Sequence, residues 1–196
     1  MTDLAERRGM DDDVYGPAED TRLLAEATRD AVTTGDRVLD VGTGSGFVAE
    51  VARDAGARVV GSDVNPHACR AARERGIPVV RGNLTAPFRA GTFDFVLFNP
   101  PYLPTPPEET GDDWMAKALS GGESGRAVVT PFLDDVGRVL APDGAVLLLV
   151  SSLTGLDEVR DTANENGLVA EEVASEKYPF ERLVALRLIT TNHQTD

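Results

Sequence analysis

The residues best suited to chemistry are Asn99, Pro100, Pro101 and Tyr102, which directly follow the apolar run 93–98. Pro101 has a fixed φ and restricts Pro100, so we expect a stiff turn at the end of a strand. The Asn99 side-chain oxygen and the Pro100 carbonyl would face outward as hydrogen-bond acceptors beside the Tyr102 ring. Such a site suits a planar –NH2 group, in an amide or an exocyclic amine, that must be aimed at an electrophile. Asn-Pro is also a common turn dipeptide, so the tetrapeptide alone leaves an ordinary turn equally open.

A glycine-rich turn lies upstream of this tetrapeptide. Gly42, Gly44 and Gly46 separate a strand pattern at 37–41 from a helical pattern at 47–55. Such a turn lets a ligand approach the backbone and presents free N–H groups at the start of a helix. The spacing differs from that of dinucleotide sites, and the Lys-Ser/Thr pair of a P-loop is absent from this sequence. Taken alone, the turn is a weak indication of a nucleotide-type ligand.

Asp63 ends the next strand pattern, about 20 residues beyond the glycines, where a carboxylate can accept hydrogen bonds from both ribose hydroxyls. Asp63 could instead be the N-cap of the helix that follows. Asn65 fits that role better, because Pro66 then occupies the first helical position. We therefore favour the ribose role for Asp63.

Helical and strand patterns alternate along the chain and must position these residues. Helical patterns cover 18–31, 47–55, 66–75, 126–140 and 156–166, and strand patterns cover 37–41, 58–63, 78–81, 93–98, 145–151, 168–175 and 183–189. The nearly continuous apolar strand at 145–151 is typical of a sheet covered on both faces. The sequence predicts an α/β fold with a doubly wound, mostly parallel, seven-stranded sheet and an antiparallel C-terminal strand. Ligands bind at the carboxyl ends of the strands in such sheets.

Length and composition favour one domain of 196 residues, of which 41% are hydrophobic. We expect a mobile N-terminal arm over 1–13, a single domain over 14–190 and a polar tail over 191–196. The polar start argues against a secretory signal, and no apolar run is long enough for a transmembrane helix. The single cysteine, Cys69, excludes an internal disulfide, and the two histidines, His67 and His193, are isolated, so we predict no metal site.

The net charge is −14, and the acidic residues are scattered along the whole chain. This pattern favours adaptation to a salt-rich cytoplasm, as in salt-loving microbes, over one acidic docking patch. It also argues against direct binding of nucleic-acid phosphates, which needs a basic stripe.

The glycine turn, the Asp63 carboxylate and Asn-Pro-Pro-Tyr, in that order, resemble the S-adenosylmethionine-dependent methyltransferases that modify planar amino groups, whose fold is Rossmann-like. Three further segments resemble the HemK-related glutamine methyltransferases of archaea and eukaryotes: Val-Tyr-Gly-Pro-Ala-Glu-Asp-Thr at 14–21, Ala-Leu-Ser-Gly-Gly-Glu-Ser-Gly-Arg at 118–126 and Lys-Tyr-Pro-Phe-Glu-Arg-Leu at 177–183. The resemblance extends from about 14 to 188.

The resemblance implies methylation of the glutamine in the Gly-Gly-Gln motif of a class-one translation release factor. It also implies a small zinc-binding activator that pairs with an edge strand, for which Ile77-Pro78-Val79-Val80 is the candidate. An unpaired apolar edge is a liability that a partner removes. Pro78 and the high charge could already protect this edge, and we favour the partner.

The resemblance also assigns the cofactor site. Asp40, Gly42 and Gly44 would line the methionine portion, Asp63 would bind the ribose, and Val64 would pack on the adenine. Asn83 and Leu84 stand where the family usually has Asp-Leu; the Asn83 amide oxygen can still accept from the adenine amine but adds no negative charge. Tyr15, Glu19 and Thr21 match a segment that folds over the cofactor, and they equally suit the entrance of a helix.

In this interpretation the Asn99 side-chain oxygen and the Pro100 carbonyl hold the substrate –NH2 next to the cofactor, Pro101 stiffens the turn, and Tyr102 packs on the amide plane. The insert 105–126 would shape the substrate mouth, with Trp114 either a docking aromatic or an anchor of the loop. Two alternatives remain: a methyltransferase acting on exocyclic amines of nucleic acids, and a non-catalytic scaffold that binds S-adenosylmethionine.

Overall fold

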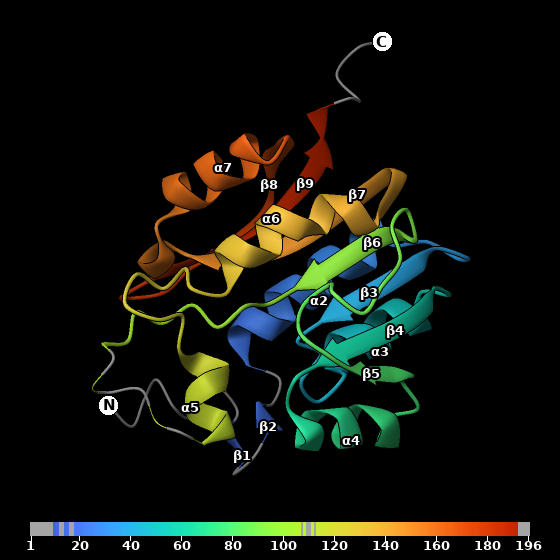
Figure 1. The fold of residues 1–196 in the computed structure, drawn as a ribbon, viewed down its shortest axis with the longest axis horizontal. Coiled ribbons are helices and arrows are strands. Elements are labelled where there is room, and N and C mark those ends of the chain that lie inside the picture. Colours follow the sequence, from blue (N-terminus) through green and yellow to red (C-terminus); the bar gives the residue numbers. More distant parts are fainter. Residues whose placement is uncertain are drawn as a thin grey trace.

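A seven-stranded sheet crosses the molecule in the order β5-β4-β3-β6-β7-β9-β8 (Figure 1). The computed structural model describes residues 10–11, 14–15, 18–106, 108, 111 and 113–191. The strands are β3 (Arg37–Val41), β4 (Arg58–Asp63), β5 (Val79–Arg81), β6 (Phe93–Phe98), β7 (Leu140–Ser151), β8 (Leu168–Lys177) and β9 (Arg182–Thr190). Only β9 is antiparallel to its neighbours, β7 and β8. The predicted fold class is confirmed.

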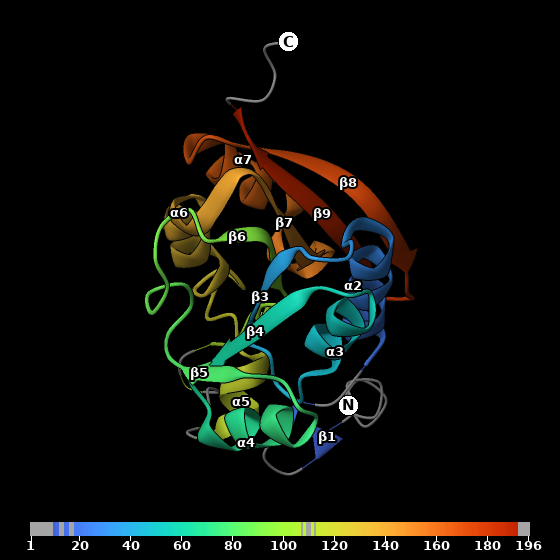
Figure 2. The same cartoon turned by 90° about the vertical axis from the view of Figure 1, so that its right-hand side faces the viewer.

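Helices cover both faces of the sheet. They are α2 (Glu19–Ala31), α3 (Phe47–Asp54), α4 (Pro66–Glu74), α5 (Trp114–Leu119), α6 (Val129–Val139), the 3-10 turn η2 (Ser152–Thr154) and α7 (Leu156–Glu165). Figure 2 shows α2 and α3 on one side of the sheet and α6 and α7 on the other. None of the helices in the described part of the chain is both long and apolar enough to cross a membrane.

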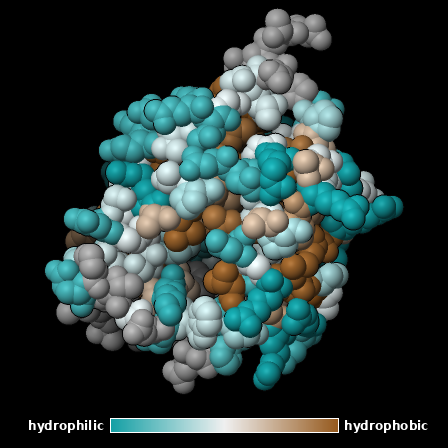
Figure 3. All heavy atoms as spheres, in the orientation of Figure 1, coloured by the Kyte–Doolittle hydropathy of each residue, from teal (hydrophilic) through white to brown (hydrophobic). Residues whose placement is uncertain are grey.

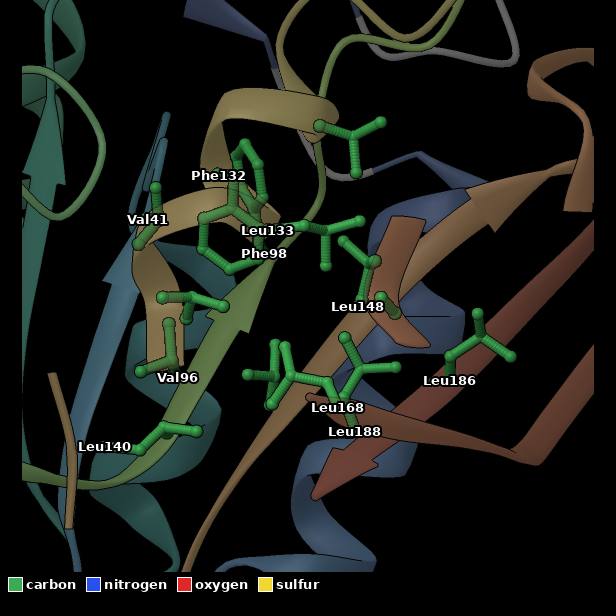
Figure 4. Close-up of a cluster of buried hydrophobic side chains, with 14 of the residues drawn as sticks. Val41, Val96, Phe98, Phe132, Leu133, Leu140, Leu148, Leu168, Leu186 and Leu188 are labelled. Carbon is green, nitrogen blue, oxygen red and sulfur yellow. The ribbon is translucent and has the colours of Figure 1, made fainter. Parts of the chain in front are cut away.

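Alternate residues of the central strands pack into two separate cores. Val96, Phe98 and Leu148 belong to the core under α6, where the Phe98 and Phe132 ring centroids are 4.4 Å apart (Figure 4). Leu97 points to the opposite core under α2. Burial on both faces explains why the sequence of these strands is almost continuously apolar.

The structure differs from the predicted elements between β6 and β7. The helix α6 ends at Val139, and β7 begins at Leu140, five positions before the predicted start at Ala145. The sequence Pro142-Asp143-Gly144 is typical of a turn, but here it lies within the strand. A Cβ on Gly144 would lie 2.8 Å from the Phe93 carbonyl oxygen, so close backbone packing, not a turn, requires this glycine.

Two small elements were not predicted. A two-stranded sheet pairs β1 (Met10–Asp11) with β2 (Val14–Tyr15), and α5 lies within the predicted insert. Most of the predicted arm 1–13 and of the tail 191–196 lies outside the described residues. Cys69 is buried in α4, and His67 is exposed.

Candidate functional site

A cavity of about 270 Å³ lies at the carboxyl ends of the central strands. Its lining comes from the turn after β3, from the segments after β4, β5 and β6, from the start of α2 and from α5. Ligand sites of open α/β sheets lie at this edge. The glycine turn and the Asn-Pro-Pro-Tyr segment both contribute, so the topology brings together the groups that the sequence separates by more than fifty positions.

The glycine turn follows a path that requires residues without a Cβ. Gly42, Gly44 and Gly46 have φ values of +60°, +53° and +82°, in the left-handed region. A Cβ on Gly46 would lie 3.0 Å from the Cβ of Ala72 in α4. The Gly44 N–H donates to Asp63 and the Gly46 N–H to the Thr43 carbonyl, so the expectation of free N–H donors is wrong at these two positions.

Asp63 accepts backbone hydrogen bonds at both carboxylate oxygens. Oδ2 accepts from the Gly44 N–H at 3.0 Å and Oδ1 from the Asn65 N–H at 2.8 Å. Each oxygen keeps a further lone pair, so these bonds orient the carboxylate without exhausting its capacity to accept. Burial raises the pKa of Asp63, and its backbone hydrogen bonds oppose that rise. The helix cap is Asn65, whose side chain accepts from the His67 N–H at 2.9 Å, as the sequence predicted.

Asp40 is a deeply buried carboxyl at the end of β3, with 3% of its surface exposed. Burial raises its pKa to about 7, while a hydrogen bond at 2.6 Å from the Thr43 hydroxyl lowers it and the nearby Asp63 charge raises it. Together with Asp20 and Asp63, it gives the cavity three carboxyl groups. Several negatively charged groups in a cavity with low-dielectric walls favour a cationic ligand.

The Asn99 side-chain oxygen is the most informative atom of the site. It is buried, and it has no hydrogen-bond partner among the described residues. The amide nitrogen of the same side chain donates to the Thr21 hydroxyl at 3.4 Å. A buried acceptor without a partner is costly, and in a cavity it indicates where a ligand donor fits. The sequence predicted two outward-facing acceptors at this turn for an –NH2 group, and that role of the Asn99 oxygen stays a prediction.

Tyr102 packs beneath the turn. It is buried, lies in the core cluster under α2, and donates its hydroxyl to the Asp20 carboxylate at 3.3 Å. Pro100 and Pro101 also line the cavity. The packed Tyr102 ring and its hydrogen bond to Asp20 therefore stabilise the turn, in addition to the φ restriction of its prolines.

The cavity lining also contains Val64, Asn83 and Leu84, the three residues assigned to the adenine. Val64 is 47% exposed, which is unusual for a valine and leaves its methyl groups open to a flat ligand. Leu84 has a φ of +46°, the one left-handed non-glycine among the described residues. Strain of this kind persists where the surroundings demand it, often beside ligands.

The predicted insert closes one side of the cavity. The helix α5 contributes Trp114 and Lys117, and the Lys117 ammonium lies 5.4 Å from the Trp114 ring centroid. Asp113 caps this helix by accepting from the Ala116 N–H. Trp114 is thus at the cavity wall, while the role of the insert in shaping a substrate mouth stays a prediction.

The structure brings Thr21 into the cavity lining but not Glu19. Within the described residues, Glu19 does not contribute to the lining, and nothing is described of the Tyr15 side chain. Asp20, which the sequence reasoning did not select, lines the cavity instead. The signal was present, because Asp20 lies between the two selected residues.

The fold and the site define a class I methyltransferase. A family model described as a methyltransferase domain matches residues 39–100. A putative protein N5-glutamine methyltransferase of Methanocaldococcus jannaschii is 36% identical over 89% of this chain and 90% of its own length. Methyltransferase HEMK2 of Homo sapiens is 33% identical over 92% of this chain and 91% of its own.

A solved structure is similar over the same extent. The Mtq2-Trm112 complex of E. cuniculi, described as responsible for methylation of the eRF1 translation termination factor, matches with a TM-score of 0.76 and 30% identity. The match covers 90% of this chain and 98% of that one. The chain belongs to the HemK-related N5-glutamine methyltransferase family.

Proposed function

We propose that this protein methylates the side-chain amide nitrogen of the glutamine in the Gly-Gly-Gln motif of a class-one translation release factor, with S-adenosylmethionine as the methyl donor. The observation that carries the proposal is the buried Asn99 Oδ1 acceptor, unpartnered among the described residues and belonging to a residue that lines the cavity. Because this oxygen is buried, it has lost its hydrogen bonds to water, and it can accept one from an N–H of a planar amide instead. The similarity to named glutamine methyltransferases supports the substrate class.

The chemistry of the lining fits S-adenosylmethionine. This cofactor supplies a methyl group made electrophilic by its bond to a sulfonium sulfur. Asp40 and the glycine turn would hold the cationic methionine portion, Asp63 the ribose hydroxyls, and Val64 and Leu84 the adenine faces. Asn83, exposed at the rim, can accept from the adenine amine. These roles are the ones that the family resemblance implies, and the donors and acceptors of the lining support them.

The protein must bind and orient the glutamine amide nitrogen, which is a poor nucleophile. The amide lone pair is delocalised into the carbonyl, so orientation and electrostatics must supply the rate. Asn99 Oδ1 and the Pro100 carbonyl accept the two N–H groups, and their negative dipoles stabilise positive charge that grows on nitrogen. The braced Tyr102 holds the turn in place. Transfer replaces one N–H of the amide by N–CH3 and releases one proton.

The partner we propose is a small zinc-binding activator at the β5 edge of the sheet. Of the edge segment, Ile77 is buried in a small core, whereas Val80 is 38% exposed. Figure 3 shows hydrophobic surface gathered on the side of β4 and β5, on a face that is otherwise mostly hydrophilic. A strand added to β5 would satisfy its free edge. The similar Mtq2 structure is a complex with Trm112.

The experiment that tests this function follows tritiated methyl transfer to three substrates in molar salt: the release factor, DNA and tRNA, each with and without the activator. We expect label on the release factor alone and place the reaction in the cytoplasm, where translation factors act. Label on DNA or tRNA would assign the protein to exocyclic amines instead. Cofactor binding without any turnover would leave the non-catalytic scaffold.

A further inference from the structure

We propose that Asp20 is a positioning residue that sets the orientation of the Asn99 amide through the Thr21 hydroxyl, a role that rests on the proposed function of Asn99. The Asn99 amide can present either its oxygen or its nitrogen to a substrate. Only the oxygen end accepts from an –NH2 substrate, and the nitrogen end would repel it. A mechanism for choosing between the two ends is therefore required.

Asp20 is buried, with 3% of its surface exposed, at the start of α2. Oδ1 of its carboxylate accepts from the Thr21 N–H at 2.6 Å and from the Thr21 hydroxyl at 3.2 Å. Oδ2 accepts from the Tyr102 hydroxyl at 3.3 Å. A carboxylate is an acceptor only, so each of these partners must donate.

This requirement fixes the direction of the next bond. The Thr21 hydroxyl has one hydrogen, and donation of that hydrogen to Asp20 leaves only lone pairs to face Asn99. The Asn99 atom opposite Thr21 must then be a donor, which is Nδ2, at 3.4 Å. Oδ1 is consequently turned away from Thr21, and it has no partner among the described residues, although Asn99 itself lines the cavity.

The reverse orientation is disfavoured by the same rule. If Oδ1 faced Thr21, the hydroxyl would have to donate to Asn99, and Asp20 would lose that donor. A buried carboxylate that loses a hydrogen bond is strongly penalised. Asp20 also accepts a hydrogen bond from the Tyr102 hydroxyl. One carboxylate therefore positions both the Asn99 oxygen and the Tyr102 ring.

Two substitutions break this sequence of hydrogen bonds at different points. Asp20→Asn can donate to the Thr21 oxygen and free the hydroxyl to donate to Asn99, so both amide orientations become available. Thr21→Val keeps the shape and removes the hydroxyl. Thr28→Val is the matched control, because Thr28 is also buried in α2 and its hydroxyl donates to the Leu24 carbonyl, away from the site.

The first readout does not depend on activity. In protein labelled with 15N at asparagine, the Asn99 side-chain signal is assigned by its loss in Asn99→Ala, and its exchange with water is measured. We expect one protected Asn99 amide proton in the wild type and in Thr28→Val. Protection should be lost in Asp20→Asn and in Thr21→Val. Unchanged protection in both of these variants would overturn the proposal.

The second readout is kinetic. Asp20→Asn and Thr21→Val should lower kcat by about tenfold or more, because charge on nitrogen is stabilised mainly in the transition state. These rates are compared at saturating S-adenosylmethionine, with its dissociation constant measured separately because Asp20 and Thr21 both line the cavity, and Thr21→Ser should restore the rate lost in Thr21→Val. A loss explained wholly by weaker cofactor binding would make Asp20 a cofactor contact and refute the positioning role. If the wild type methylates no release factor, the proposed function fails, while the amide exchange still decides the orientation.

Discussion

Replacement of Asp40 by Asn should remove a large pH dependence of folding. Burial raises the pKa of Asp40 from 3.8 to about 7 in the folded protein. At 1.36 kcal/mol for each pKa unit, this rise corresponds to roughly 4 kcal/mol. Between about pH 4 and pH 7 the folded state keeps a proton that the unfolded state has lost, so the free energy of unfolding falls as the pH rises. Above about pH 7 that loss is complete.

The assay is urea unfolding of wild type and Asp40→Asn at about pH 5 and pH 8, at constant high salt. The wild type should lose stability over this interval, and Asp40→Asn should lose much less. Asp94→Asn is the matched control, because the Arg37 hydrogen bond lowers the pKa of Asp94, which is thus ionised in both states throughout the interval. Parallel pH profiles for wild type and Asp40→Asn would refute the reasoning.

Three other changes test different parts of the structure. Gly46→Ala should lower the free energy of unfolding by about 1–3 kcal/mol, and by more than Gly91→Ala, because both have left-handed φ but only the Gly46 Cβ would meet a neighbour; equal losses would contradict the contact with α4. Tyr102→Phe should lower kcat and reduce the free energy of unfolding by about 1–3 kcal/mol, since the ring stays packed but the buried Asp20 carboxylate loses a hydrogen bond; an unchanged kcat would show that this hydrogen bond does not support the site. Val80→Asp on β5 should weaken activator binding by more than about tenfold, whereas Val173→Asp on the opposite edge strand β8 should not; calorimetric titration with the activator measures both, and equal effects would place the partner elsewhere.

Much of the fold could be predicted because its signals are local. Apolar runs and glycine turns gave β3, β4 and β6 their correct bounds, and the Asn65-Pro66 pair identified the start of α4. The early start of β7 could not be predicted, since Pro-Asp-Gly is a turn sequence that tertiary packing overrides. The helix α5 is too short for a clear helical period.

The site was predictable in its parts but not in its internal contacts. Tyr102 and Asp20 lie 82 positions apart, and only the packing of α2 against the sheet brings them together. Neighbouring residues of a helix point in directions about 100° apart, so the rotation of α2 decides which of Glu19, Asp20 and Thr21 reaches the cavity. The buried positions Leu23 and Leu24 fix that rotation. The pattern of residue types in the sequence does not by itself specify this rotation of α2.

The most direct test is mass spectrometry of the Gly-Gly-Gln peptide from the release factor after incubation with this protein, its activator and S-adenosylmethionine in molar salt. We predict one added methyl on the glutamine, formed at least about a hundredfold more slowly by Asn99→Ala, which loses roughly 3 kcal/mol of transition-state stabilisation. Asn166→Ala, which removes an amide bonded to Asp134 far along the chain, should methylate like the wild type. An unmodified glutamine with cofactor and activator both bound, or equal rates for Asn99→Ala and the wild type, would contradict the account.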